Sequence, residues 1–510
     1  MAPTMTLDNH LISRLEAARV QKPQTPLFLL DDDVVPYGQF FDNARRMAAG
    51  LSHLGLQPGD RLAVQAPKTI AMLELYIATV MTGSVFLPLN VAYTPGEISY
   101  FLQDATPRLF VCATDKLQAL EPVARSAQVA HILTISHDGG GTLAGIRDCE
   151  KPDFTPFPRK KDDLAAILYT SGTTGRSKGA MLTHGALSSN SETLADLWRF
   201  TDQDILIHAL PIFHTHGLFV ATNIVLLAGA SMHFLEKFDA QKVCNLMPHA
   251  TSLMGVPTFY TRLLECPELD EAARGMRLFI SGSAPLLAET HRKWRMRTGH
   301  AILERYGMTE TNMNSSNPYE GERRPGTVGL PLPDVALRIT DPQTGVPVQQ
   351  GEIGVIEVRG PNLFAGYWQM PDKTRREMRE DGFFITGDMA QQDEDGYIHL
   401  VGRCKDLIIC GGFNVYPKEV ELTIDAVDAV LESAVIGIPH SDLGEAVVAI
   451  VVPKQGRTID SEKLTAHLQG VLARFKQPRH IFCMQALPRN AMGKVQKNLL
   501  REKYADVFAS

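Results

Sequence analysis

The sequence lacks the features that direct a protein to nucleic acid, to a membrane or to an oxidising compartment. Its seven cysteines are scattered and form no Cys-x-x-Cys pair, so we expect reduced thiols and no thiolate metal site. A net charge of −7 and a pI near 6.2 offer no basic surface for nucleic acid or anionic lipid. Residues 1–20 have no continuous apolar core, and the longest apolar stretch, Leu218 to Ala230, is too short for a bilayer. These absences predict a soluble cytoplasmic protein that binds small molecules, with its oligomeric state left open.

Predicted strands and helices alternate from Leu27 onward. Short apolar runs such as Arg61 to Gln65 and Val85 to Leu89 are interleaved with helical patterns such as Tyr37 to Leu54 and Ile70 to Met81. This alternation predicts an α/β fold with doubly wound, mainly parallel sheets. A chain of 510 residues is long enough for more than one domain.

The stretch from Tyr169 to Gly179 has the composition of a phosphate-binding loop. It follows an apolar run, Leu164 to Leu168, predicted as a buried strand, and precedes a helical pattern at His184 to Trp198. Its glycines let the backbone turn N–H groups toward phosphate oxygens, and Lys178 supplies positive charge. The spacing is not that of a Gly-x4-Gly-Lys-Ser/Thr loop, and an ordinary turn is the alternative interpretation. The candidate phosphate ligands are Thr170, Ser171, Gly172, Thr173, Thr174, Gly175 and Lys178.

Three further segments are each interpreted as a strand that ends in a turn and a helix start. They run from Met254 to Leu264, from Leu278 to Pro285 and from Ala301 to Glu310. Ligands of open α/β sheets bind beyond the carboxyl ends of the strands, so these turns should converge on one cleft. The residues they would bring there are Arg262, Ser283, Ala284, Glu304, Arg305, Tyr306, Gly307, Thr309 and Glu310.

Two histidines, His214 and His216, lie in the segment Leu210 to Gly217, which we interpret as extended. Their spacing could suggest a metal, but no carboxylate or thiol ligand stands nearby in the sequence. The wall of a substrate pocket is the favoured position, and a buried structural role stays open for either histidine.

The motifs, taken in order, resemble the signatures of the adenylate-forming superfamily, which contains acyl-CoA synthetases, luciferases and peptide-synthetase adenylation domains. After the phosphate loop come Tyr306-Gly-Met-Thr-Glu310, Thr386-Gly-Asp388, Gly402-Arg403-Cys-Lys405-Asp406 and Gly493-Lys494. The resemblance covers nearly the whole chain from about Leu27. It implies a large N-terminal domain, residues 1–402, with a small β-barrel subdomain over 354–400. It also implies a mobile α+β C-terminal domain, residues 403–510, with a hinge near Lys405.

The resemblance further implies ATP, Mg²⁺ and coenzyme A as ligands. Tyr306 would stack on adenine, Thr309 would meet the α-phosphate and Glu310 would bind Mg²⁺, for which carboxylate oxygen is suitable. Asp388 would accept hydrogen bonds from the ribose hydroxyls. The other implied residues are Thr174 at the metal, Arg403 near the ribose, Lys405 at the hinge, Lys494 in the cleft, and Gly411 and Gly412 beside the pantetheine tunnel. Judged alone, Glu310 could be a carboxylate at a helix start and Lys494 a surface lysine.

The implied reaction has two steps. ATP first converts a carboxylate, which is a poor electrophile, into an acyl adenylate, and a thiol then takes the acyl group. Nucleotidyl transfer depends mostly on positioning and charge neutralisation. In the family the small domain then rotates about the hinge, withdraws its lysine and forms the pantetheine tunnel. The candidate catalytic residues are Lys178, His214, Thr309, Glu310 and Lys494.

Arg305 departs from the glycine that many superfamily members have directly before the Tyr-Gly pair. A buried unpaired guanidinium is costly, and a second substrate carboxylate would satisfy it through paired hydrogen bonds. With Arg262, His214, His216 and Ser283, it makes the chain similar to malonyl-CoA synthetases, which implies malonate as the acid.

Other interpretations stay open. The two arginines could pair with Glu304, Glu310 or aspartates of the fold. The acid could be methylmalonate or another short-chain acid, because one methyl group changes discrimination by only about 1–3 kcal/mol. The acceptor could be a carrier protein instead of coenzyme A. A non-catalytic nucleotide-binding regulator is disfavoured, because binding alone needs neither Lys494 nor Glu310.

Overall fold

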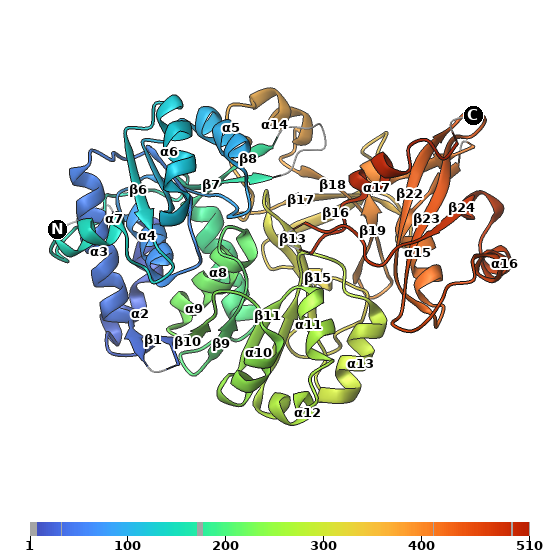
Figure 1. The fold of residues 1–510 in the computed structure, drawn as a ribbon, viewed down its shortest axis with the longest axis horizontal. Coiled ribbons are helices and arrows are strands. Elements are labelled where there is room, and N and C mark those ends of the chain that lie inside the picture. Colours follow the sequence, from blue (N-terminus) through green and yellow to red (C-terminus); the bar gives the residue numbers. More distant parts are fainter. Residues whose placement is uncertain (1–7, 32, 171–176, 412, 491–492, 509–510) are drawn as a thin grey trace.

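The computed structural model describes residues 8–31, 33–170, 177–411, 413–490 and 493–508 (Figure 1). These residues form four sheets. Two sheets with their helices make up the large body on the left and below in Figure 1, and a third lies between that body and the small unit on the right. None of the helices in the described ranges is long and apolar enough to cross a membrane.

The first sheet has six strands in the order β6-β5-β3-β4-β7-β8, and only β8 is antiparallel to its neighbour. Helices α5 and α6 cover one face, and α3, α4 and α7 lie on the other, so the sheet is doubly wound as predicted. The strands are β3 (Arg61–Gln65), β4 (Val85–Pro88), β5 (Leu109–Ala113), β6 (His131–Ile135), β7 (Leu164–Thr170) and β8 (Lys178–Thr183). The helices are α3 (Tyr37–His53), α4 (Ile70–Met81), α5 (Pro95–Ala105), α6 (Leu117–Ser126) and α7 (Thr142–Asp148).

The second sheet has nine strands in the order β15-β14-β13-β12-β11-β9-β10-β1-β2. The strands are β1 (Pro26–Leu29), β2 (Val34–Pro36), β9 (Ile205–His208), β10 (Ser231–Phe234), β11 (Ser252–Gly255), β12 (Leu278–Ser281), β13 (Leu303–Met308), β14 (Asn312–Ser316) and β15 (Leu330–Pro331). The helices of this part are α1 (His10–Leu15), α2 (Ala17–Gln21), α8 (His184–Leu197), a π-helix (His216–Thr222), α9 (Asn223–Ala228), α10 (Ala240–Leu246), α11 (Pro257–Leu263), α12 (Leu269–Ala272) and α13 (Ala288–Thr298). Because β11, β12 and β13 are neighbours, the turns that follow them meet at one edge.

Three local predictions are wrong. The phosphate loop joins β7 to the antiparallel strand β8, so a strand stands between the loop and helix α8. The turn after β13 leads into β14 and not into a helix, so Glu310 does not answer a helix dipole. The histidine segment is not extended throughout, because His216 begins the π-helix. In each case contacts distant in sequence override the local pattern.

The third sheet, predicted as a small β-barrel, has four antiparallel strands in the order β16-β17-β18-β19. They are β16 (Ala336–Thr340), β17 (Gly354–Arg359), β18 (Phe384–Gln392) and β19 (Ile398–Arg403), and α14 (Pro371–Glu377) precedes β18.

The small unit after β19 has its own sheet and its own two apolar cores. Its elements are β20 (Ile408–Cys410), β21 (Phe413–Val415), α15 (Pro417–Asp425), β22 (Val430–His440), β23 (Gly444–Pro453), α16 (Ser461–Val471), β24 (His480–Cys483) and α17 (Lys497–Lys503). An ion pair links it to the large body: Lys454 lies 3.6 Å from Glu289 of α13, which also pairs with Lys293 at 2.7 Å.

Candidate active site

Lys494 of the small unit reaches the edge where β11, β12 and β13 end. The neighbouring Gly493 lies against α11, since a Cβ there would be 3.7 Å from Thr258 Oγ1. Desolvation by the surrounding protein atoms lowers the pKa of Lys494, and the charge of Arg403 lowers it further. The charges of Asp388 and Glu310 raise it. The residue nevertheless remains exposed to solvent.

The predicted ribose site is preformed by hydrogen bonds. Asp388 and Arg403 stand opposite each other on β18 and β19, and their side chains form an ion pair of 2.5 Å. The hydroxyl of Tyr306, on β13, donates to Asp388 at 2.6 Å. Burial and the nearby Asp388 raise the pKa of Tyr306, so it remains a neutral donor. Three strands of two sheets therefore place these groups together without a ligand.

A second cluster lies at the ends of the phosphate loop, around the hydroxyl of Tyr367. Lys178 Nζ donates to this hydroxyl at 3.1 Å and lies 3.9 Å from Glu377. The hydroxyl is 3.0 Å from Glu310 Oε1 and 2.8 Å from Glu377 Oε2, and it can donate its one proton to either. Thr170 Oγ1 lies 3.4 Å from Glu310. These oxygens are the donor type that Mg²⁺ prefers.

Sequence reasoning missed Tyr367 and Glu377. The two partners Lys178 and Tyr367 are separated by 189 residues, and only the Gly-Tyr-Trp triplet at 366–368 marks the segment as unusual.

The predicted acid pocket contains unsatisfied polar groups. Arg305 is 4% exposed, and its Nε and Nη2 find no hydrogen-bond partner among the residues that the structure describes. His216 Nδ1 is 3.2 Å from Ser283 Oγ, whereas His216 Nε2 has no partner within the same residues. Ser283 has a φ of 69°, a strained backbone of the kind that clusters at functional sites. The guanidinium lies directly over Gly282, where a Cβ would be 2.4 Å from Arg305 Cζ.

Burial is the main influence on charge in this pocket. It lowers the pKa of Arg305 and that of His216, on which Arg305 acts in the same direction. Burial and Lys494 lower the pKa of His214 to about 3, so this half-buried imidazole is neutral. Arg305 is not ion-paired with Glu304 or Glu310 in the described structure, so the alternative of internal pairing gains no support. No group of three or more His, Cys, Asp or Glu residues in the described ranges could hold a metal, and His216 contacts Ser283 instead.

Family models match two parts of the chain. Residues 15–368 match the AMP-binding enzyme model, and residues 419–494 match the model of the AMP-binding enzyme C-terminal domain. The chain belongs to the AMP-binding enzyme family.

One relative of this AMP-binding enzyme is a malonate–CoA ligase of Arabidopsis thaliana. It is 32% identical over 519 residues, which cover 95% of this chain and 83% of the relative. The solved structure of ATP-bound MatB from Rhodopseudomonas palustris is 55% identical, with a TM-score of 0.96 over 98% of this chain and 100% of that one. Apo MatB, with the same identity and the same coverage, gives a TM-score of 0.85. The structure of this chain as a whole is therefore closer to the ATP-bound structure than to the apo structure.

Four other predicted residues of this AMP-binding enzyme lie on β13 or in the turns that follow β12 and β13. Thr309 is half-buried in the turn after β13, and Gly307 leaves no room for a side chain, since a Cβ would lie 1.9 Å from Asn312 O. Ala284 is half-buried beside Ser283. Burial raises the pKa of Glu304, on the same face of β13 as Tyr306, to about 8.

The remaining predicted residues lie on α11, in the small unit or in the phosphate loop. Arg262 is exposed on α11, and no contact brings it to Arg305 in the described structure. Lys405 is exposed in a 3-10 turn, whose Asp406 pairs with Arg501 of α17 at 2.7 Å. Gly411 has a φ of 58°, which glycine adopts without strain. Ser171, Gly172, Thr173, Thr174, Gly175 and Gly412 lie outside the described residues.

Proposed function

We propose that this AMP-binding enzyme ligates malonate to coenzyme A through a malonyl-adenylate, with release of pyrophosphate and AMP. The proposal is supported chiefly by Arg305, a buried guanidinium with two unpaired nitrogens beside His216 and Ser283. A buried cation without a partner is costly, and a dicarboxylic acid would supply one. The malonate–CoA ligase relative supports the same choice of acid.

In the first step, one carboxylate of the acid binds Arg305 and His216, and the other faces the nucleotide. An oxygen of that second carboxylate attacks the α-phosphorus, so that a P–O bond forms while the bond to pyrophosphate breaks. Lys494 neutralises the charge on both reactants, and Thr309 binds the α-phosphate. Glu310, with Thr174, would hold Mg²⁺, which would offset the charge of the phosphates. Lys178 binds the phosphates after it leaves Tyr367.

In the second step, the coenzyme A sulfur attacks the acyl carbon, and the bond from that carbon to AMP breaks. Rotation of the small domain about Lys405 would withdraw Lys494 and bring Gly411 and Gly412 to the thiol path. We assign the neutral His214 to the wall of the acid pocket and Arg262 to its rim. We also assign the protein to a reducing compartment, the cytoplasm, because all seven cysteines are free thiols.

The test is AMP formation that depends on both ATP and coenzyme A, with malonate, methylmalonate, succinate, acetate and benzoate as acids, each with and without Mg²⁺. We expect malonate to give the highest kcat/KM. A higher kcat/KM for acetate or benzoate than for malonate would contradict the proposed role of Arg305 but not the adenylate mechanism. Absence of turnover with every acid would favour a nucleotide-binding regulator.

A further inference from the structure

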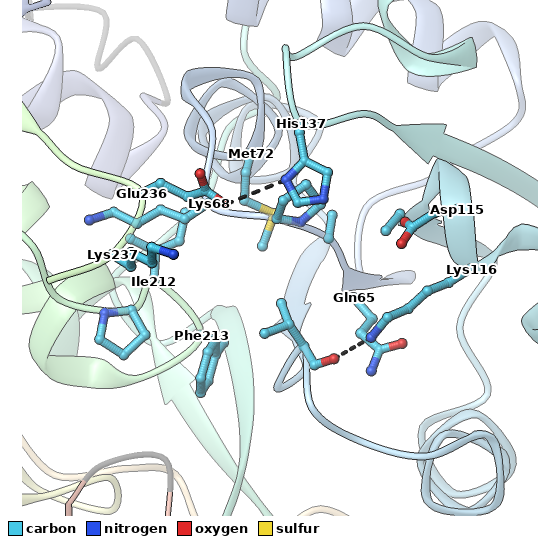
Figure 2. Close-up of a pocket in the computed structure, with 15 residues that line it drawn as sticks. Gln65, Lys68, Met72, Asp115, Lys116, His137, Ile212, Phe213, Glu236 and Lys237 are labelled. Atoms are coloured by element: carbon cyan, nitrogen blue, oxygen red, sulfur yellow. Dashed lines mark hydrogen bonds and ion pairs between the residues drawn. The ribbon is translucent and has the colours of Figure 1, made fainter. Parts of the chain in front are cut away.

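A cavity of about 270 Å³ lies where β3, β5 and β9 end (Figure 2). Lys68 and Gln65 face it from the first sheet, and Ile212 and Phe213 face it from the segment after β9. That segment continues directly into the histidines of the acid pocket. The cavity is therefore lined in part by the segment that leads to those histidines, and its polar residues are not used by the mechanism above.

Lys68 is the unusual member of this cavity. Its Nζ donates to His208 O at 2.8 Å and to His208 Nδ1 at 3.1 Å, and it lies 4.3 Å from the ring centroid of Phe234. No carboxylate pairs with it within the described part of the chain. Lys68 is half-buried, and burial lowers its pKa. A lysine held there without a counter-charge is costly, so stability alone does not explain it. Lys68 precedes α4 of the first sheet, whereas His208 ends β9 of the second, so this contact joins the two sheets.

The contacts of His208 define its tautomer. The carbonyl of Gly217 can only accept, so Nε2 carries the hydrogen, and Nδ1 accepts a hydrogen bond from Lys68. Nε2 lies 2.9 Å from the carbonyl oxygen of Gly217 and donates to it. The hydroxyl of Thr222 donates to the same carbonyl at 2.9 Å. Lys68 is thus connected through one neutral imidazole to the backbone of Gly217.

Gly217 is the second residue of the π-helix, directly after His216. π-Helices are rare and frequently occur at functional sites. Gly217 packs closely on the backbone of Pro211, because a Cβ at this position would lie 2.1 Å from Pro211 O. A restraint on the Gly217 carbonyl therefore fixes the direction in which His216 enters the acid pocket, where its Nε2 has no partner among the described residues.

We propose that Lys68 is a positioning residue for the acid pocket: through His208 it holds the carbonyl of Gly217 and so orients His216 toward the acid. The proposal rests on the proposed function only in that His216 binds the acid. It predicts that Lys68 affects the KM of the acid and leaves the KM of ATP and coenzyme A unchanged.

The experiment compares Lys68→Met, Lys68→Arg and Lys116→Met with the wild type, using the acid that the wild type uses best. Lys116 lines the same cavity but donates to Val91 O, so its variant makes the same substitution in that cavity without touching His208. We expect Lys68→Met to raise the KM of the acid by about three- to tenfold, the range for one lost hydrogen bond. We expect Lys68→Arg to recover part of this loss and Lys116→Met to show none.

A second readout does not require activity. In ¹⁵N spectra of histidine-labelled protein, with His208 assigned from His208→Asn, the Nδ1 signal should shift in Lys68→Met and not in Lys116→Met. An unshifted signal, an equal effect of Lys116→Met on the KM, or a matching rise in the KM of ATP would overturn the proposal. Poor use of malonate by the wild type would instead contradict the proposed acid and leave these comparisons valid.

Discussion

The two faces of strand β13 differ in whether their polar side chains have hydrogen-bond partners. Side chains alternate along a strand, so Glu304 and Tyr306 share one face and Arg305 occupies the other. On the nucleotide face, Tyr306 donates to Asp388, which is also paired with Arg403. On the acid face, Arg305 and His216 keep nitrogens without partners in the described structure. The polar groups beside Tyr306 are therefore paired without a ligand, whereas those beside Arg305 lack partners that an anion would supply.

Lys494 lies between the two faces, so its loss should have the largest effect. We expect Lys494→Ala to lower the rate of AMP formation by about 10²–10³-fold, the cost of removing one preorganised group at a developing charge. Thioester formation from synthetic malonyl-adenylate should fall much less, because in the proposed mechanism the lysine is withdrawn before that step. Equal losses in the two half-reactions would show that the variant damages the whole cleft.

Arg305→Met should weaken binding of the acid and leave binding of ATP unchanged. We expect the KM of malonate to rise by about 10- to 100-fold, since hydrogen bonds to charged groups are stronger than neutral ones. The KM of ATP and the use of acetate should change little. Arg262→Met is the matched comparison: its side chain is exposed, so we expect less than about a threefold change. A larger effect of Arg262→Met would move the carboxylate site to α11.

Asp388→Asn should affect the nucleotide face alone. The variant keeps the shape of the side chain but loses the ion pair with Arg403 and one strong acceptor for the ribose. We expect the KM of ATP to rise by about tenfold with the KM of malonate unchanged. Isotope-dilution or calorimetric measurement of AMP binding would check this without turnover, and unaltered AMP affinity would contradict the ribose assignment.

Glu304 should affect stability and not substrate binding, through a pH dependence of the free energy of unfolding. Its pKa is raised from 4.5 to about 8, so the folded state keeps a proton that the unfolded state releases. The stability contributed by this group is therefore present below about pH 4.5 and is lost as the pH rises to about 8. The Tm of Glu304→Gln should decline less than that of the wild type over this window. Parallel Tm profiles would mean that Glu304 is ionised in the folded protein.

The sequence alone predicted the elements whose pattern is continuous. Strand β3 and helix α4 have the predicted bounds, because their mostly apolar sequences leave few alternatives. Strand β14 was missed because its sequence, Asn-Met-Asn-Ser-Ser, is polar. The Nδ2 of Asn312 donates to Asn362 O, 50 residues further along the chain, and a contact at that separation cannot be predicted from the local pattern. The π-helix was also missed. The carbonyl of Gly217, its second residue, accepts hydrogen bonds from His208 of β9 and from Thr222, and the local sequence does not predict these contacts.

The candidate site followed the same division. Motif residues such as Tyr306, Asp388 and Lys494 could be named in advance, and the structure brings them together. Tyr367 could not, because its importance comes only from the three charged groups that surround it. Arg305 could be singled out, but only the folded chain shows that no acid of the described residues neutralises it.

The ion pair between Lys454 and Glu289 has a consequence for domain rotation. Glu289 is shared by Lys454 of the small unit and Lys293 of its own helix. When the small unit departs, Glu289 keeps Lys293 and no carboxylate is stranded. Lys454 is itself partly solvated and 3.8 Å from Asp428 in its own unit. The ion pair therefore favours the docked position of the small unit but would add little to the barrier for the rotation that we propose.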